Sequence, residues 1–334
     1  MTFLYYDEFG VRYPNKIKAL QKTKNLYFDY YDEVYDKLNW KIEPTESLDF
    51  YYKHQAQRIR DEYDYVILCY SGGYDSTNIL ETFYYNNIKL DKIVVTGPFS
   101  QDRLINGDEN HNGEIYLNAF PYLKELGLDS ITQVIDYTEH YGKIETFSAY
   151  NLGESWVEEI GSRFSPHHWF WRDLDRFVIP KQFEDKKVAI IWGTDKPNLR
   201  IKNGVKSFRF IDTAITSYGR TNQPFRSNIT NINFYWDPNY PLILLKQLHV
   251  IKNLELPLTP KPVVNLIYNL KKPLIYKSGK TIGFLIAKRD MFLMNHKDTK
   301  IFDFYKQGIK KLEEYFPDSY KNLPSIDSKY YAIE

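Results

Sequence analysis

The sequence predicts an α/β protein built on a doubly wound parallel sheet, with a helical N-terminal prelude and a mixed, mostly helical C-terminal region. Between residues 62 and 200, short apolar runs alternate with helix-compatible stretches, a pattern typical of parallel strands joined by helices. Two of these runs end in glycine followed by polar residues. Beyond residue 200 the alternation stops. We therefore expect three parts, which are residues 1–61, 62–200 and 201–334.

The N-terminal part is rich in Tyr, Lys, Asp and Glu. Residues 27–40 place apolar side chains at helical spacing, which favours helices here. We expect these helices to cover one edge of the sheet. We interpret the tyrosines and the tryptophan of this segment as packing residues and not as a ligand site.

The central part supplies the expected strands and helices of the sheet. Its apolar runs are short and rich in β-branched and aromatic residues, as strands require. Ligands of parallel sheets bind at the carboxyl ends of the strands, near the point where strand order reverses. The expected strands are 65–70, 92–96, 131–137 and 188–192, and the expected helices are 78–85, 114–126, 148–160 and 169–183.

The C-terminal part differs in pattern. Residues 199–210 alternate around Asn203-Gly204, which predicts a β-hairpin with a two-residue turn. Prolines then divide the chain into short segments. The better helix candidates are residues 242–254 and 300–315.

The most specific pattern follows the first expected strand, where the apolar run ends in Ser-Gly-Gly and a helix begins. This geometry points backbone N–H groups and a helix dipole at one anion, and glycine lets the backbone approach it closely. Hydroxyls add donors, and a carboxylate can hold magnesium beside the anion. The pattern predicts a phosphate cradle made by Ser71, Gly72, Gly73, Asp75, Ser76 and Thr77.

The run Ser71-Gly72-Gly73-Tyr74-Asp75-Ser76 resembles the Ser-Gly-Gly-x-Asp-Ser signature of the PP-loop ATP pyrophosphatases, the adenine nucleotide alpha hydrolase-like superfamily. Within it, the chain looks most like the synthetase domains of asparagine synthetase and β-lactam synthetase. The resemblance covers residues 62–200. It implies a doubly wound, HUP-like fold, binding of ATP and Mg²⁺, and cleavage of ATP between the α and β phosphates.

A second glycine turn follows the expected strand 188–192. Gly193 permits close backbone approach, and Thr194, Asp195 and Lys196 follow at once. In the synthetase relatives a carboxylate in a similar turn joins the first aspartate on magnesium, so the resemblance implies Asp75 and Asp195 as metal ligands. The same residues also fit a plain turn with a solvated Asp195–Lys196 pair.

Three further segments are weaker candidates. In the superfamily the strand tip equivalent to Thr96-Gly97 lies against adenine and ribose, although a simple strand end fits these residues equally well. Residues 165–173 combine histidine, aromatic and arginine residues, which fits either a packed helix start or a substrate-recognition segment. Lys280 lies in a sequence like the end of a Walker A motif that lacks the earlier glycine, so we reject a P-loop NTPase. The relatives place a lysine over the phosphates, which makes Lys196 and Lys280 candidate catalytic cations, with a surface basic loop as the alternative for Lys280.

The single cysteine, Cys69, limits the function classes. It lies inside the apolar run and is interpreted as a core residue. One cysteine excludes Cys-x-x-Cys metal sites and intrachain disulfides, and it argues against the sulfur-transfer members of the superfamily. The second residue is Thr2, so we expect no fused glutaminase domain of the kind that begins with a catalytic cysteine.

Composition restricts partners and location. The net charge of +1 gives no strong sign of nucleic-acid binding, and no apolar run reaches membrane-spanning length. The N-terminus lacks a signal-peptide pattern, so we expect a cytoplasmic protein. Short PP-loop proteins of AT-rich composition look like those of phages, which would place it in the host cytoplasm. No oligomeric state is indicated.

The favoured hypothesis is an ATP-dependent adenylating enzyme that forms AMP and pyrophosphate. It would activate a carboxylate, amide or carbonyl acceptor, either a small molecule or a nucleotide or base, for attack by a nitrogen nucleophile. The alternatives are a PAPS-reductase-like or sulfur-transfer protein and a non-catalytic nucleotide-binding module. The pattern identifies neither the acceptor nor the nitrogen donor.

Overall fold

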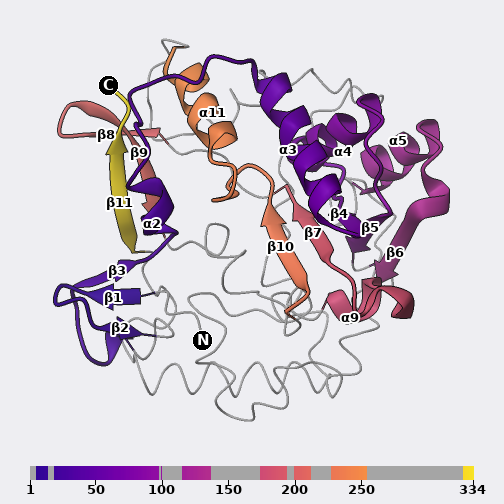
Figure 1. Cartoon of the computed structure of the whole chain (residues 1–334), viewed down its shortest axis with the longest axis horizontal. Coiled ribbons are helices and arrows are strands. Elements are labelled where there is room, and N and C mark those ends of the chain that lie inside the picture. The colour runs from indigo at the N-terminus through magenta and orange to yellow at the C-terminus, as the bar shows by residue number, and fades with distance from the viewer. Residues whose placement is uncertain are drawn as a thin grey trace.

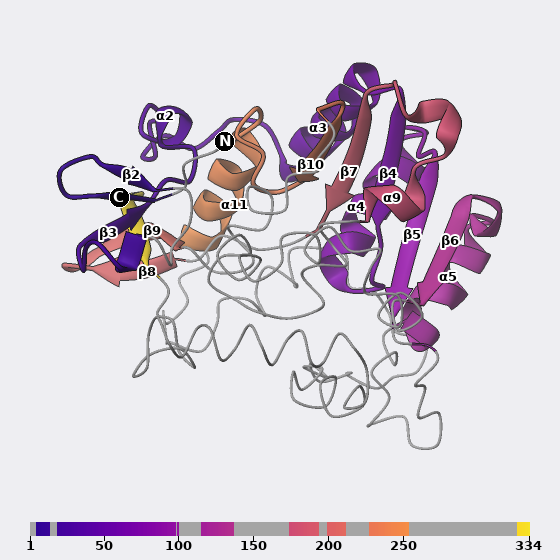
Figure 2. The same cartoon turned by 90° about the horizontal axis from the view of Figure 1, so that it is seen from below.

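A computed structural model of the chain describes three sheets and the helices that pack on them (Figure 1). The parallel sheet lies at one end of the molecule and the antiparallel strands at the other, with helix α11 between them in both views (Figure 2). The described residues are 5–13, 19–97, 99, 115–136, 174–193, 199–211, 227–253 and 326–334.

The central element is a five-stranded sheet in which every neighbouring pair is parallel. The prediction of an α/β protein with a parallel sheet is therefore confirmed. The strand order is β10-β7-β4-β5-β6, so the chain adds β5 and β6 on one side of β4 and then returns to add β7 on the other. The strands are β4 (Tyr65–Cys69), β5 (Lys92–Gly97), β6 (Thr132–Asp136), β7 (Val188–Trp192) and β10 (Ile229–Asn233).

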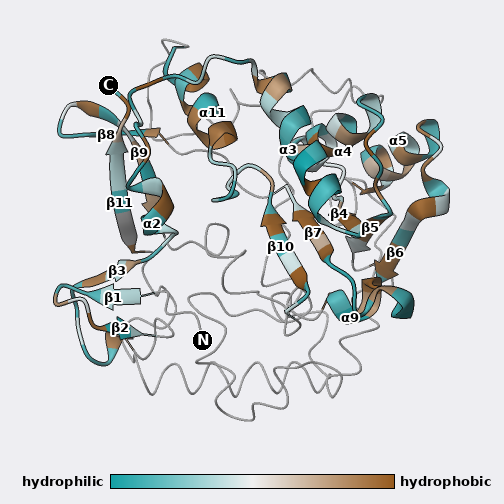
Figure 3. Ribbon diagram, in the orientation of Figure 1, coloured by the Kyte–Doolittle hydropathy of each residue, from teal (hydrophilic) through white to brown (hydrophobic). Residues whose placement is uncertain are grey.

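Burial explains why the two central strands form where they do. All five residues of β4 and all five of β7 are buried, and both ribbons are largely hydrophobic (Figure 3). Ile67 faces Ile190 in the paired register. Strands covered on both faces read as continuous apolar runs, which is how the sequence revealed them.

Helices cover this sheet. Ser47 caps α3, since its hydroxyl oxygen accepts a hydrogen bond from the Phe50 N–H at 3.1 Å. Helix α3 packs against α4 and α11, and both α3 and α4 contact β4. A π-helical turn, Ile115–Ala119, leads into α5. The helices are α3 (Leu48–Glu62), α4 (Tyr74–Tyr85), α5 (Phe120–Glu125), α9 (Asp175–Val178) and α11 (Leu242–Lys252).

The expectation of a helical prelude is wrong for residues 5–7, 12–13 and 26–28. These residues form an antiparallel sheet of β1 (Tyr5–Asp7), β2 (Arg12–Tyr13) and β3 (Leu26–Phe28), and within 27–40 only α2 (Asp32–Tyr35) is an α-helix. In β1 and β3 the buried positions alternate with less buried ones, which is the period of a strand. Each of these strands is three residues long, which is too short for the alternation to be recognised in the sequence.

The hairpin prediction is confirmed. Strands β8 (Leu199–Lys202) and β9 (Val205–Ile211) are antiparallel, and Asn203 and Gly204 both adopt positive φ, 52° and 79°. Two such residues make the turn whose twist suits a hairpin. A third strand, β11 (Asp327–Ala332), pairs with β9.

The predicted part boundaries do not coincide with the packing. Strand β10 lies beyond residue 200 yet completes the parallel sheet, and α3 lies before residue 62 yet packs on β4. Among the described residues of 201–334, strands β9, β10 and β11 accompany helix α11, so a mostly helical region is wrong for them. Residues of these segments are buried together in one connected hydrophobic cluster, so packing groups segments that the sequence separates.

An aromatic cluster joins the two ends of the molecule. Trp236, which follows β10, contacts Tyr30 at 5.8 Å and Phe208 at 5.2 Å between ring centroids. Trp40 stacks on Tyr331 at 4.5 Å. Tyr30, Tyr35 and Trp40 are each at most 5% exposed, so the interpretation as packing residues is confirmed for these three.

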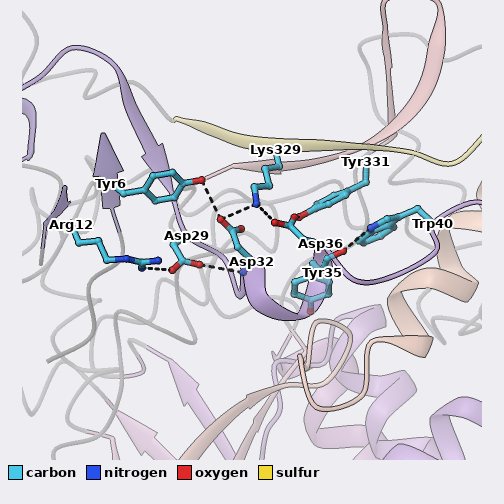
Figure 4. Close-up of polar contacts among 9 residues, drawn as sticks. All are labelled: Tyr6, Arg12, Asp29, Asp32, Tyr35, Asp36, Trp40, Lys329 and Tyr331. Atoms are coloured by element: carbon cyan, nitrogen blue, oxygen red, sulfur yellow. Dashed lines mark hydrogen bonds and ion pairs between the residues drawn. The ribbon is translucent and has the colours of Figure 1, made fainter. Parts of the chain in front are cut away.

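A set of ion pairs ties the last strand to helix α2 (Figure 4). The Lys329 ammonium lies 3.1 Å from Asp32 and 2.5 Å from Asp36, and the Tyr331 hydroxyl donates to Asp36 at 2.5 Å. Burial lowers the pKa of Lys329, but the two carboxylates outweigh it and raise the pKa above its usual value. We call these residues, together with Tyr6, which donates to Asp32, the terminal clasp.

Replacing Lys329 by methionine is expected to lower the free energy of unfolding at pH 7 by about 1 kcal/mol, because Asp32 and Asp36 lose their shared cation. The raised pKa of Lys329 means that its contribution is complete below 10.5 and disappears as pH rises through the folded-state pKa. Urea titrations at pH 7 and pH 9 should therefore give the same difference from wild type. Substituting the exposed Lys187 by methionine is the control, and an equal loss there would contradict the clasp.

Candidate nucleotide site

The turn between β4 and α4 has the geometry that its sequence predicts. Strand β4 ends at Cys69, and the helix begins at Tyr74 with Gly73 as its N-cap. Gly72 has φ +82°, a conformation that side chains with a Cβ disfavour. The first turn of a helix directs N–H groups that lack intrahelical acceptors along its axis. Their positive end faces the edge of the sheet where β4 ends.

The serine side chains brace this turn from within. The Ser71 and Gly73 N–H groups donate to Ser76 Oγ and Ser71 Oγ, each at 3.2 Å. Ser76 Oγ donates to the Gly73 carbonyl at 3.1 Å and lies 3.1 Å from Ser71 Oγ. Ser71 is exposed, whereas Ser76 is 4% exposed. The turn is therefore held in shape by its own hydroxyls, and Ser71 is the one that faces solvent.

Thr77 has a supporting position, not a solvent-facing one. It is 1% exposed, and its hydroxyl lies 3.2 Å from the Tyr70 hydroxyl. Its N–H donates to the Gly73 carbonyl at 2.9 Å, which is the first helical bond of α4. Direct contact of the Thr77 side chain with a ligand is therefore not supported by this geometry.

Tyr235 is a site residue that sequence reasoning missed. Its hydroxyl donates to the Asp75 carbonyl at 2.8 Å and accepts from Asn78 Nδ2 at 3.0 Å. Burial and the nearby Asp75 carboxylate raise the pKa of Tyr235 well above its usual value, so the phenol stays protonated and keeps donating. It lies 160 residues from Asp75, and no local pattern marks it.

Gly193, which directly follows β7, packs against the backbone at the start of α4. A Cβ on this residue would lie 2.9 Å from the Ser76 nitrogen and 3.1 Å from the Asp75 carbonyl carbon. The close approach expected of Gly193 is thus an approach to the backbone of α4. Gly193 and the start of α4 meet where β4 and β7 are neighbours, which is the point where strand order reverses.

The other predicted residues divide into two groups. Thr96 and Gly97 end β5, the neighbour of β4 on its other side, with Thr96 half-buried and Gly97 buried. Thr194, Asp195, Lys196 and Lys280 lie outside the described residues, as does segment 165–173. The proposed pairing of Asp75 with Asp195 on a metal stays a prediction.

Cys69 is a core residue. It is 7% exposed, and burial raises its pKa well above the usual value, which disfavours the reactive thiolate. In the described ranges, no three His, Cys, Asp or Glu side chains gather as a metal site would require. This finding is compatible with magnesium, which commonly uses one or two carboxylates together with substrate phosphates and water.

Comparison with known proteins places the chain in no family. It matches no family model, no curated protein and no solved structure at a significant level. Over the described ranges, none of the helices has the length and hydrophobicity that crossing a bilayer requires.

Proposed function

We propose that the chain binds ATP at the Ser71–Ser76 turn and transfers its adenylyl group to an acceptor, as a PP-loop ATP pyrophosphatase with a doubly wound sheet. The observation that carries the proposal is the glycine turn between β4 and α4 at the β4–β7 reversal point, with Gly193 packed on the start of α4. In parallel sheets this point is where nucleotides bind. The Ser-Gly-Gly-Tyr-Asp-Ser pattern adds the chemistry of a phosphate cradle.

The residues present fit a triphosphate. Backbone N–H groups at the start of α4 and the exposed Ser71 hydroxyl would bind phosphate oxygens, and the positive φ of Gly72 shapes the turn that carries them. Asp75, half-buried in the first turn of α4, would hold Mg²⁺, which neutralises phosphate charge when bound. The Tyr235 hydroxyl donates a hydrogen bond to the Asp75 carbonyl and so holds the backbone of Asp75 in place. These groups position phosphates rather than exchange protons.

In the proposed reaction, an acceptor oxygen attacks the α-phosphorus and pyrophosphate leaves. A nitrogen nucleophile then attacks the activated acceptor carbon, AMP leaves with the acceptor oxygen, and the nitrogen proton passes to solvent. Positioning and charge neutralisation account for most of the rate, so no dedicated protein base is needed for the first step. A sulfur-relay reaction has less support, since Cys69 is buried within β4.

Pyrophosphate release from ATP in the presence of magnesium and candidate acceptors tests this proposal. Asp75→Asn is expected to reduce magnesium-dependent ATP binding by about tenfold, because one ligand charge is removed while the helix start is retained. Asp49→Asn, in the first turn of α3, is the matched control. ATP binding by wild type without any pyrophosphate release across acceptors would favour a binding module. Unchanged magnesium dependence in Asp75→Asn would overturn the metal assignment.

A further inference from the structure

A pocket of about 230 Å³ lies along β10, the strand at one edge of the parallel sheet. Three segments form its walls, which are the N-terminal residues 30–34, strand β10 and the loop 236–239. The volume suits a small molecule and not a nucleotide. This pocket is distinct from the Ser71–Ser76 turn.

The pocket and the candidate nucleotide site share one stretch of chain. After β10, the Phe234 N–H donates to the Trp192 carbonyl at 3.1 Å, beside Gly193. The next residue, Tyr235, donates to the Asp75 carbonyl. The two residues after that, Trp236 and Asp237, line the pocket. Five consecutive residues from Asn233 therefore connect the two sites.

The ionised groups in the wall are acidic. Among the described residues that line the pocket, lysine, arginine and histidine are absent, while Glu33 and Asp237 are present. Asp237 already accepts hydrogen bonds from Gln55, Arg58 and the Asn239 N–H. Glu33 is exposed and has no hydrogen bond or ion pair with any described residue. The charge available to a ligand is therefore the Glu33 carboxylate.

The remaining wall is aromatic and amide-rich. The half-buried Tyr31 provides ring surface, which attracts cations, and Asn239 stands exposed at the margin. Tyr31 has φ 55° and ψ 46°, a left-handed conformation that is unfavourable in a residue with a side chain. Strain of this kind persists where the surroundings impose it.

Contacts outside the pocket hold Tyr31 in that conformation. The Asp29 carboxylate accepts from the Asp32 N–H at 3.2 Å and pairs with Arg12 at 2.8 Å (Figure 4). The Tyr31 carbonyl accepts from the Val34 N–H at 2.9 Å. The turn that carries Tyr31 and Glu33 is thus fixed from both sides before any ligand arrives.

We propose that this pocket binds a small primary ammonium ion, which supplies the nitrogen nucleophile of the second step. Glu33 pairs with the positive charge, the ring of Tyr31 faces the adjoining methylene groups, and the exposed Asn239 amide binds its polar part. The role as nitrogen donor rests on the proposed adenylation, whereas the binding of an organic cation does not. Loss of one proton to solvent makes the bound ammonium ion a nucleophilic amine.

Three probes of similar shape test the charge preference in the full-length protein. Saturation-transfer NMR titrations with n-butylammonium, butyramide and butyrate are expected to give binding in that order, with the cation at least about fivefold tighter than the neutral amide. Glu33→Gln should weaken n-butylammonium about fivefold and leave butyramide unchanged. Asn239→Lys, at an exposed position, should weaken the cation in the same way. The exposed Glu46→Gln is the control and should change nothing.

The outcomes separate the two proposals. Butyrate or butyramide binding as tightly as the cation overturns the pocket assignment, and so does an unchanged cation affinity in both Glu33→Gln and Asn239→Lys. Measuring ATP binding on the same samples isolates the other proposal. Selective cation binding without ATP binding would keep the cation site but remove its role as nitrogen donor. ATP turnover with no cation preference would leave adenylation standing and overturn the pocket.

Discussion

Replacing Gly193 by alanine is expected to weaken ATP binding about 100-fold, the cost of misplacing a binding group by about 1 Å. The added Cβ would lie 2.9 Å from the Ser76 nitrogen, 3.0 Å from Ser76 Cα and 3.1 Å from the Asp75 carbonyl carbon. These are backbone atoms, so no side chain can rotate away. The first turn of α4 must move away from β7, and the N–H groups that would hold phosphate move with it.

The same substitution is expected to cost stability. Inserting a methyl group into a closely packed region typically costs about 1–3 kcal/mol. Gly193→Val should cost more than Gly193→Ala, since it adds two further carbons at the same place. Urea unfolding of both variants gives the stability order, and calorimetric titration with ATP and magnesium, under conditions where each is folded, gives the affinity.

Gly127→Ala separates the two effects. Gly127 follows α5 at φ +68°, and a Cβ added there would have no atom within 4 Å, so alanine costs about 1 kcal/mol through its conformation alone. It lies far in sequence from both glycine turns, and ATP affinity should be unchanged. If Gly193→Ala binds ATP as tightly as wild type, α4 does not provide the phosphate site.

The strand, glycine turn and helix start of the proposed cradle could be predicted because their determinants are local. A buried strand, a glycine with positive φ and a helix start occupy residues 65–77, and each leaves its own pattern in the sequence. The hairpin at Asn203-Gly204 was predictable for the same reason. A structure that a few neighbouring residues determine can be predicted from the sequence of those residues.

The features that were missed depend on distant residues. Strand β10 has the sequence Ile-Thr-Asn-Ile-Asn, which is too polar to stand out, and pairing with the buried β7 makes it a strand. Tyr235 reaches Asp75 only because β10 lies beside β7. Strand β1 pairs with β3, about twenty residues later, in runs too short to show a period.

The neighbour of Gly193 in the structure differs from the one that its sequence pattern predicted. A glycine after a buried strand predicts close approach of something, and ligand phosphate was the expected neighbour. The neighbour in the structure is the backbone of Ser76. In the proposed site, the glycine would therefore act on the ligand through the position of α4. Only the packing of β7 beside β4 distinguishes these two roles.

Replacing Asp91 by alanine is expected to lower the free energy of unfolding by about 3 kcal/mol at pH 7, because a mostly buried arginine then loses its carboxylate. Asp91 is 9% exposed in its side chain and lies 2.5 Å from Arg60 and 2.8 Å from Lys89. It also accepts from the Val66 N–H at 2.8 Å, near the start of β4. One carboxylate thus joins α3, β4 and the start of β5.

The pH dependence identifies the charge as the cause. Burial alone would raise the pKa of Asp91, but Lys89, Arg60 and the Val66 N–H lower it below 3.8. A lowered folded-state pKa means that the contribution is complete above 3.8 and is lost as pH falls through the folded-state value. Urea titrations should therefore show the full difference from wild type at pH 7 and a smaller one at pH 3. Asp91→Asn, which retains an acceptor for the Val66 N–H, should have a stability between those of wild type and Asp91→Ala. The exposed Asp129→Ala should stay within about 0.5 kcal/mol of wild type. A difference that is constant from pH 7 to pH 3 would mean that shape, and not the ion pairs, makes Asp91 stabilising.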